Sequence, residues 1–452
     1  MINQQFFDII EFEETISKEV SPMAIISQIS IYDNTENFDN LGDLERIKFI
    51  IENIPDDWIL AKLRKDKDYR GRKGNELEIL MNVYWAKFAL ERTKISETLR
   101  ELRRNSQLRK LIGIKNEEVP SKYALSRFMS KLKKYEINLK EVFYRQRDEL
   151  NRLVEDFGEE AGADGKYIDS YARKESKNTQ TDGRRDTDAK YGIKEKYYKD
   201  KDGNEKIKNE THFGYRVHIL ADVNYELPID YEITTANVNE GKILDQMLRS
   251  KRNKQLMKGC RSLTADKGYD DGKRLALLED MGIIPIIDKR VKVKEEIEIV
   301  RTVYYDDSGN VNCYCPIEGI KRPMAFNGYD KARDTLSYKC PAKAYGIICK
   351  GCETCNCPVK TTIRIKRAIN PRVFTQIARD SYKWKRYYNK RTALERINSR
   401  LDCGYKFEEH TIRGIDKMKV NVDMAMIVMM TIAIENIKLG RKEKIRSLVS
   451  CA

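Results

Sequence analysis

Residues 261–288 read RSLTADKGYDDGKRLALLEDMGIIPIID and contain two kinds of pattern. The first ten residues are a short apolar run that enters a turn, where Gly268 permits a sharp change of direction. The next twelve have the spacing of a helix and end at Gly282, after which IIPIID has the composition of a second strand. Strand, turn, helix and strand in this order predict a sheet with helices packed on it.

The preceding segment extends this pattern toward the amino terminus. A short apolar run, GKYIDSYA, is a strand candidate, and residues 172–209 are a polar excursion that we interpret as mobile or variable. Two β-forming runs then flank a turn at Asn224–Tyr225, which predicts a hairpin, and a helical stretch follows from 241 to 250. Three strands, helix, strand, helix and strand predict a mixed α/β domain.

Charge is the strongest compositional signal. The 452 residues include 86 Lys+Arg and 71 Asp+Glu, and because residues 1–40 carry −7, the rest of the chain carries +22. Residues 91–140 hold 14 Lys/Arg and six acids in a helix–turn–helix pattern, in which Ser96 and Ser121 are expected N-caps and residues 113–120 a break. Such helices suit docking on a phosphate backbone, and an ordinary charged helical bundle is the alternative. Four of their cations are candidate DNA contacts: Arg103, Arg104, Arg109 and Lys110.

Several function classes have no support in the sequence. The chain has three histidines, no Gly-x-Ser-x-Gly elbow, and neither a Walker loop nor a GxGxxG motif. Carboxylates are therefore the expected catalytic groups. No signal peptide is expected at the acidic start, and residues 420–434 are interrupted by polar residues, so we expect a buried helix, no membrane association and a cytoplasmic location.

Three carboxylates lie where sites form in α/β proteins. Asp169 ends the first predicted strand, Asp266 ends the strand quoted above, and Glu395 lies in a helix with Tyr388 and Arg391 on the same face. Hard oxygen ligands suit Mg²⁺ or Mn²⁺, and two such ions roughly 3.5–4 Å apart support phosphodiester chemistry. Chance placement among 71 acids and a solvated Arg–Glu pair are the alternatives.

The local sequences narrow the choice. Tyr388, Arg391 and Glu395 have the spacing of the Tyr-(2)-Arg-(3)-Glu-(6)-Lys signature, and in this respect the chain resembles bacterial insertion-sequence DDE transposases of the insertion-sequence-four superfamily, eleven-eighty-two-type group. Asp402 stands where that signature has Lys, which puts the corresponding DNA contact in doubt. Further blocks similar to the family are residues 265–270, 213–218, 235–239, 102–105 and 120–128.

The resemblance implies a ribonuclease-H-like core in which Asp169, Asp266 and Glu395 hold two metal ions, with Asp164 and Asp186 as alternatives for the first Asp. It also implies that Tyr388 and Arg391 contact DNA phosphate, that a homodimer binds double-stranded transposon ends and target DNA, and that the protein is bacterial and nucleoid-associated. The implied reaction is phosphodiester hydrolysis followed by joining of the 3′-OH ends to target DNA. A non-catalytic DNA-binding regulator and a nuclease without strand transfer remain alternatives.

The expected organisation follows from these patterns. It comprises an acidic lead-in (1–40), a helical DNA-binding domain (41–155), a first part of the core (160–290), a Cys-rich β insert (291–365), a second part of the core with the Glu395 helix (366–440) and a tail (441–452).

Seven cysteines cluster in the insert: Cys313, Cys315, Cys340, Cys349, Cys352, Cys355 and Cys357. Their Cys-x-Cys and Cys-x₂-Cys spacing suits structural Zn²⁺, whereas free thiols and an iron–sulfur cluster are the alternatives. The last gap departs from the ferredoxin pattern, because Cys357 follows Cys355 after one residue instead of three.

We predict that the insert binds about one zinc ion per chain through four of these thiolates, because Cys-x-Cys and Cys-x₂-Cys pairs occur together in a protein that we expect in the reducing cytosol. Elemental analysis of protein purified without added metal tests this. Less than about 0.2 zinc per chain, together with seven thiols that react under native conditions, would contradict it.

Overall fold

The computed structural model describes residues 42–65, 74–115, 118–134, 137–172, 186–199, 205–290, 296–315, 317–350, 359 and 361–447. These residues form two compact units. The described residues of unit 1 lie within 42–153, 170–188 and 399–447, and those of unit 2 lie within 154–169 and 189–398. The predicted acidic lead-in lies outside the described residues.

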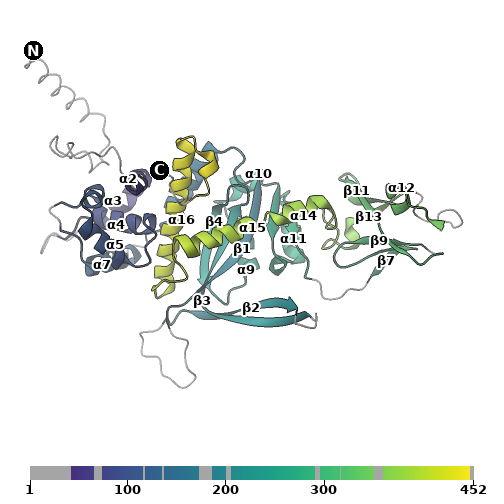
Figure 1. Ribbon diagram of the computed structural model, residues 1–452, viewed down its shortest axis with the longest axis horizontal. Coiled ribbons are helices and arrows are strands. Elements are labelled where there is room, and N and C mark those ends of the chain that lie inside the picture. The colour runs from purple at the N-terminus through teal and green to yellow at the C-terminus, as the bar shows by residue number, and fades with distance from the viewer. Residues whose placement is uncertain are drawn as a thin grey trace, which may run out of the picture. The chain divides into compact units, whose positions relative to one another are not determined.

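Unit 2 is built on a six-stranded mixed sheet (Figure 1). In this sheet β1 pairs antiparallel with β3 and parallel with β5, β5 pairs parallel with β6, and β3 also pairs with β2 and β4. Helices α9 and α11 connect the strands, so the arrangement fits a ribonuclease-H-like α/β core. The elements are β1 Glu160–Asp169, β2 Lys190–Lys199, β3 Glu205–Asp222, β4 Leu227–Thr235, α9 Glu240–Arg249, α10 Lys254–Gly259, β5 Ser262–Ala265, η4 Lys267–Tyr269, α11 Gly272–Asp280 and β6 Ile284–Ile287.

The predicted hairpin is present, and its turn is held by one buried carboxylate. Asp222 at the end of β3 accepts hydrogen bonds of 2.7 Å from the backbone N–H groups of Asn224, Tyr225 and Gly158. Burial raises the pKa of Asp222 to about 6, against the effect of these donors. This carboxylate therefore joins the turn to the segment that leads into β1.

The helix that carries Glu395 is broken. The sequence predicts one helix that carries Tyr388, Arg391 and Glu395 on the same face, but α14 spans Tyr382–Asn389 and α15 spans Thr392–Ser399, so Arg391 lies between the two helices. Backbone hydrogen bonds from Lys390 to Tyr387 and from Arg391 to Tyr388 form the tighter turn between them.

The segment between β6 and α14 contains two small antiparallel sheets, ordered β10-β9-β8-β7 and β11-β12-β13. Their buried side chains form a separate apolar cluster that includes Val303, Leu336 and Phe374. The elements are β7 Ile297–Val300, β8 Val303–Tyr305, β9 Val311–Tyr314, β10 Lys321–Pro323, β11 Ala325–Asp330, β12 Thr335–Lys339, α12 Pro341–Tyr345, β13 Thr362–Lys366 and η5 Arg367–Ile369.

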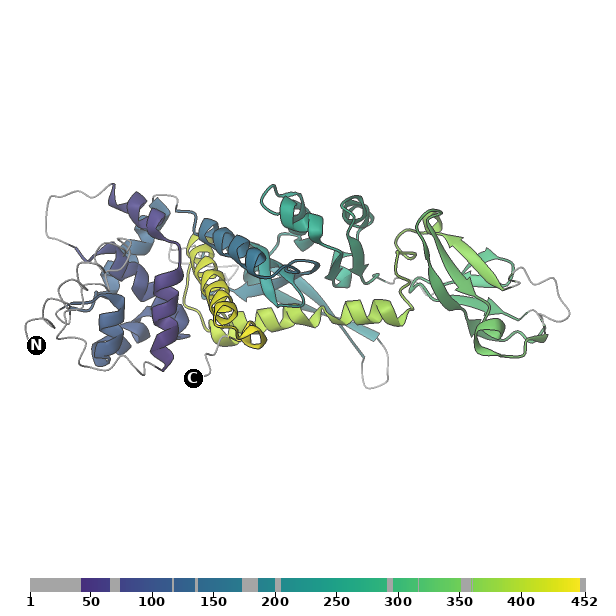
Figure 2. The same ribbon diagram turned by 90° about the horizontal axis from the view of Figure 1, so that it is seen from above.

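Unit 1 is helical, and its centre is the carboxyl-terminal helix α16. This helix packs on α8, beside which it lies in Figure 2, and also on α2 and α4. It is the one helix of the described part that is long and apolar enough to cross a membrane, but 83% of its apolar window is buried within the protein. The elements are α2 Asp43–Asn53, α3 Asp57–Arg64, α4 Leu77–Ala89, α5 Ile95–Arg104, α6 Ser106–Ile112, α7 Lys122–Lys134, α8 Lys140–Leu153, η6 Arg400–Gly404, α16 Ile415–Lys438 and η7 Lys442–Lys444.

Three expectations from the sequence need correction. The excursion at 172–209 contains β2 and the start of β3, because these charged residues pair with each other as a ribbon.

Of the two predicted helix caps, one is confirmed: Ser121 caps α7, with its hydroxyl accepting from the Ala124 N–H at 3.1 Å. Ser96 is not a cap, since α5 begins at Ile95 and Glu97 accepts from the Lys94 N–H instead. The residues from 399 onward group with unit 1, whereas we had assigned 366–440 to the core.

We predict that Asp222→Ala lowers the free energy of unfolding by about 3 kcal/mol, because three N–H groups lose their acceptor in a buried turn. Urea denaturation of the full chain measures this. Asp156→Ala is the matched control, since Asp156 accepts only an exposed hydrogen bond from the Tyr225 hydroxyl and its loss should cost less than about 0.5 kcal/mol. Equal losses in the two variants would contradict this account of the turn.

Candidate active site

Two aspartates lie side by side where β1 and β5 run in parallel. The last residues paired between the two strands are Ala163 and Ala265, and Asp164 and Asp266 directly follow them in sequence. The Asp266 carboxylate accepts from the Gly268 N–H at 2.7 Å, which orients it at the start of the turn η4. Burial raises the pKa of Asp164, and the nearby charge of Asp266 raises it further. This is the electrostatic signature of two carboxylates that share one site.

Asp169 does not lie at this position. It is five residues beyond Asp164 on β1, so strand alternation puts its side chain on the opposite face of the sheet. Its carboxylate is 67% exposed and lies 3.0 Å from the Nδ1 atom of His212. Asp186, the other alternative for the first Asp, belongs to unit 1 and accepts from the Gly414 N–H at 2.9 Å. Of the three aspartates considered, Asp164 is therefore the one beside Asp266.

Helix α15 covers the face of β1 that carries Asp164. Gly162, two residues earlier on the same face, permits this approach, since a Cβ there would lie 3.0 Å from the Leu394 Cδ1 atom. One turn further along α15, the Asn398 amide donates to the Asp164 carboxylate at 2.9 Å. Glu395 is one turn before Asn398, is 55% exposed and forms an ion pair of 2.7 Å with Arg391. Helix α15 thus brings the Asn398 amide to Asp164 and carries Glu395 one turn away, while Arg391 directly precedes the helix.

Tyr388 lies at the end of α14, directly before the break. Its ring stacks on Trp384 with a centroid distance of 4.8 Å, and burial raises its pKa. The nearby charges of Asp288 and Asp266 raise the pKa of Tyr388 further, while Arg391 lowers it. Tyr388 and Arg391 therefore both lie within electrostatic reach of the carboxylates.

A fourth carboxylate, missed by the sequence analysis, lies in the same cluster. Glu240 is the first residue of α9, and burial raises its pKa to about 7 against the effect of the Arg216 guanidinium. The charges of Asp266 and Asp164 raise the pKa of Glu240 further. An acid at the start of a helix is commonly explained by the helix dipole, so the local sequence gave no reason to single it out.

The donor atoms of this cluster suit a hard divalent cation. They are carboxylate oxygens together with the side-chain oxygen of Asn398, which is buried without a hydrogen-bond partner among the described residues. Such an orphaned acceptor is costly unless a cation or water completes it. Within the described residues, no three His, Cys, Asp or Glu side chains lie close enough together to hold a metal ion directly. The cluster thus has the residue types that a divalent metal needs. The carboxylates must rotate toward one another before three of them can bind the same ion.

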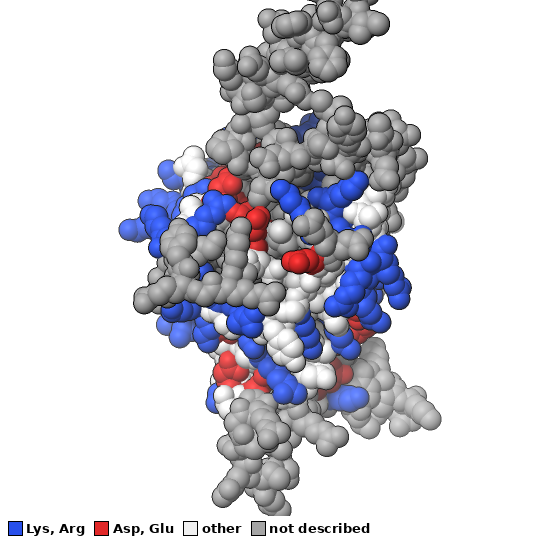
Figure 3. Space-filling model, turned by 90° about the vertical axis from the view of Figure 1, so that its left-hand side faces the viewer, with Lys and Arg blue, Asp and Glu red and all other residues white. Residues whose placement is uncertain are grey.

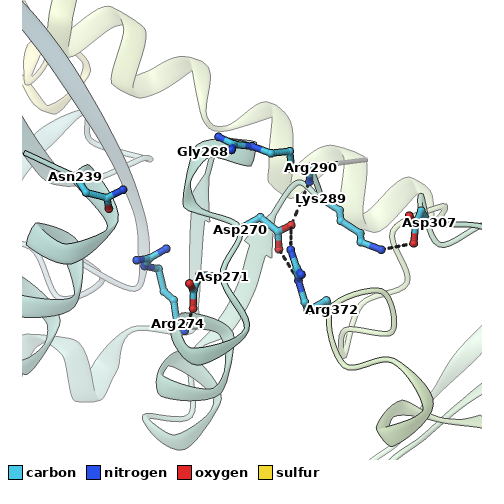
Figure 4. A pocket seen from close by; sticks show the side chains of 9 residues that line it. All are labelled: Asn239, Gly268, Asp270, Asp271, Arg274, Lys289, Arg290, Asp307 and Arg372. Carbon is cyan, nitrogen blue, oxygen red and sulfur yellow. Dashed lines mark hydrogen bonds and ion pairs between the residues drawn. The ribbon is translucent and has the colours of Figure 1, made fainter. Parts of the chain in front are cut away.

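A hollow of about 470 Å³ lies next to this cluster, beyond Gly268 (Figure 4). Its charges are largely matched in pairs: Arg372 binds Asp270 at 2.6 Å and Lys289 binds Asp307. The other lining residues are Asn239, Asp271, Arg274 and Arg290.

The four cations predicted to contact DNA differ in their surroundings. Arg103 and Arg104 are exposed in the last turn of α5. Arg109 donates to the carbonyl oxygens of Leu102 and Arg103 at 2.9 and 3.0 Å, so it closes the end of α5. Lys110 is half-buried on α6. Lys and Arg side chains gather over much of the face drawn in Figure 3.

Of the seven clustered cysteines, Cys352, Cys355 and Cys357 lie outside the described residues. Cys315 and Cys340 are buried, Cys313 and Cys349 are half-buried, and none of these four is in a disulfide. The Glu318 N–H lies 3.5 Å from the Cys315 Sγ atom, and the Glu318 carboxylate forms an ion pair of 3.2 Å with Arg322. Zinc binding stays a prediction.

Comparison with known proteins identifies the family of this chain. A model of the family described as "Transposase DDE domain" matches residues 175–431. No curated protein matches the sequence. A solved structure, the cryo-EM structure of a piggyBac transposase synaptic complex with hairpin DNA, is similar over 90% of this chain and 79% of that chain, with 14% identity and a TM-score of 0.37. The family model covers more than half of the 452 residues, and the chain therefore belongs to the transposase DDE domain family.

Proposed function

We propose that this protein is a DNA transposase that cuts phosphodiester bonds at transposon ends and joins the freed 3′-OH ends to target DNA. The observation that carries the proposal is the position of Asp164 and Asp266 at adjacent points of two parallel strands, beneath the helix that bears Glu395. Membership of the transposase DDE domain family supports the same reaction class. Family members generally use divalent metal ions, and we propose two Mg²⁺ or Mn²⁺ ions here.

In this proposal the acidic triad is Asp164, Asp266 and Glu395. Asp164 takes the role that the sequence analysis gave to Asp169, because Asp169 faces the other side of the sheet. When bound, two divalent ions activate the attacking oxygen and stabilise the leaving oxygen of the phosphodiester. Asp164 and Asp266 supply oxygen ligands from the strands, and Asn398 fixes the orientation of Asp164 through its amide.

Arg391 has two functions in this proposal. Without metal, Arg391 forms an ion pair with the Glu395 carboxylate. When Glu395 turns toward the aspartates to bind metal, the Arg391 guanidinium is released and can donate two hydrogen bonds to a DNA phosphate. The Tyr388 hydroxyl is a second candidate donor to the same phosphate, because it lies beside the Arg391 side chain.

The helices of unit 1 are the proposed DNA-binding surface, with Arg103 and Arg104 as exposed contacts. The excess of basic residues in this region supports a sequence-independent contribution to DNA affinity. We further propose a bacterial insertion sequence of the eleven-eighty-two-type group as the source, a dimer as the form bound to double-stranded DNA, and a cytoplasmic, nucleoid-associated location.

Replacing single carboxylates tests the proposed triad. We expect Asp164→Asn, Asp266→Asn and Glu395→Gln each to lower cleavage of transposon-end DNA by about 10³-fold or more, because each removes one charge that a metal-dependent transition state needs. DNA binding should persist in all three variants. Mg²⁺ or Mn²⁺ should support cleavage, whereas Ca²⁺ should permit binding without cutting.

Asp169→Asn is the matched control on the same strand and should cleave at close to the wild-type rate. Loss of activity in Asp169→Asn but not in Asp164→Asn would reverse this assignment alone. Normal cleavage by both Asp266→Asn and Glu395→Gln would overturn the DDE mechanism. Pre-cut ends and a supercoiled target then separate a transposase, which yields joined products, from a nuclease, which yields none.

Salt dependence tests the DNA-binding surface. We expect the double variant Arg103→Ala/Arg104→Ala to flatten the slope of log affinity against log salt by about 1.8, because each lost phosphate contact contributes about 0.9. The full chain is required, since α16 completes the core of unit 1. Arg109→Ala should instead lower the stability of unit 1 by roughly 1–2 kcal/mol, because it frees two helix-end carbonyls. An unchanged slope in the double variant would move the DNA contact elsewhere.

A further inference from the structure

We propose that Glu240 is a fourth carboxylate of the metal site, acting together with Asp164, Asp266 and Glu395. This inference rests on the proposed function, because it assigns a residue to the same site. It adds a ligand from helix α9, which approaches the two aspartates from the side opposite α15.

The backbone positions Glu240 without using its carboxylate. Asn239 caps α9, since its side-chain oxygen accepts from the Lys242 N–H at 3.2 Å. Helix α9 packs against β1, β3 and η4, so its first turn lies over the segments that carry the two aspartates. Among the described residues, the Glu240 carboxylate has an ion pair of 3.5 Å with Arg216 and no hydrogen bond. It is therefore free to serve as a ligand.

Each oxygen of Glu240 lies against one of the two aspartate segments. A Cβ at Gly165, directly after Asp164, would lie 2.5 Å from the Glu240 Oε2 atom. A Cβ at Gly268, two residues after Asp266, would lie 3.0 Å from the Oε1 atom and 2.8 Å from the Asp266 Oδ1 atom. Glycine at both positions leaves the space that the carboxylate fills. The oxygens of Glu240 and Asp266 therefore converge on the same point of the backbone.

Glu240 lies on the Gly165 face of β1, which strand alternation places opposite the face that carries Asp164. Strand β5 ends at Ala265, so Asp266 and Gly268 lie beyond the end of this strand. Glu240 meets the cluster at this strand end, where Gly268 lies against the oxygens of both Glu240 and Asp266.

Three carboxylates, those of Asp164, Asp266 and Glu240, interact with one another. Arg216 forms an ion pair with Glu240, and the charges of Lys194 and Arg391 also act on the cluster. Arg216 is itself buried and lies 3.9 Å above the ring of Tyr167, which limits how far it can move. Asn398, whose amide donates to Asp164, has a buried side-chain oxygen without a hydrogen-bond partner among the described residues, as an acceptor awaiting a ligand or water would have.

Direct measurement of Mn²⁺ binding to the full chain tests the inference without reference to activity. Titration calorimetry with Mn²⁺ alone, at neutral pH and without DNA, should give an affinity at least about tenfold weaker for Glu240→Gln than for wild type, on the scale seen when a metal's ligand shell is altered. Asp245→Asn is the matched control, because Asp245 lies on the same helix and pairs with Arg274 at 2.8 Å. It should bind Mn²⁺ as wild type does.

The other outcomes separate this inference from the proposed function. If Glu240→Gln binds Mn²⁺ like wild type while Asp266→Asn does not, Glu240 only pairs with Arg216, and the inference is overturned while the function stands. If wild type binds no more Mn²⁺ than Asp266→Asn, the proposed metal-dependent function fails. Should thermal melting show that Glu240→Gln is unfolded, Glu240→Asp retains the charge on a shorter side chain. Its Mn²⁺ affinity should also fall, and wild-type affinity in that variant would overturn the inference.

Discussion

The parallel pairing of β1 with β5 brings Asp164 and Asp266 together, and the remaining features of the proposed site depend on it. Two adjacent carboxylates repel each other, and burial adds to the cost of ionising Asp164. The fold offsets this by backbone and side-chain donors, namely the Gly165 N–H at 2.9 Å and the Asn398 amide. All four residues of β5 are buried, so this pairing lies in the interior of unit 2.

Glycines allow the surrounding elements to come close enough. At Gly162 the absence of a side chain lets Leu394 and Val223 pack directly on β1, which fixes α15 above Asp164. At Gly165 and Gly268 the same absence makes room for Glu240. In each case a larger residue would separate a functional helix from the strands. These glycines therefore contribute no chemical group to the site, but they allow the side chains that do to come close together.

Basic residues of unit 1 are not equivalent, although the sequence presents them as one run. Arg103 and Arg104 extend into solvent, where they can meet a phosphate backbone, while the Arg109 guanidinium completes the hydrogen bonds of a helix end. Net charge over a window predicts the presence of a polyanion-binding face. It does not distinguish a cation that binds a partner from one that holds the fold.

Local pattern was sufficient for much of this protein. It predicted the α/β class, the hairpin at Asn224–Tyr225, the cap at Ser121, the strand that ends before Asp266 and the helix that contains Glu395, because apolar periodicity, turn residues and motif spacing are properties of short segments. Tertiary structure decided what depends on register and on segments far apart in sequence. Asp169 was the predicted strand-end acid, but β1 extends past the end of β5, so the position next to Asp266 falls at Asp164. Glu240 joins the cluster only because α9 packs over the strands, and the break before α15 arises where tertiary contacts hold Lys390 to Glu160 and Asn224. The sequence around a carboxylate does not show which other carboxylates lie near it in the folded protein. The packing of segments that are distant in sequence decides that.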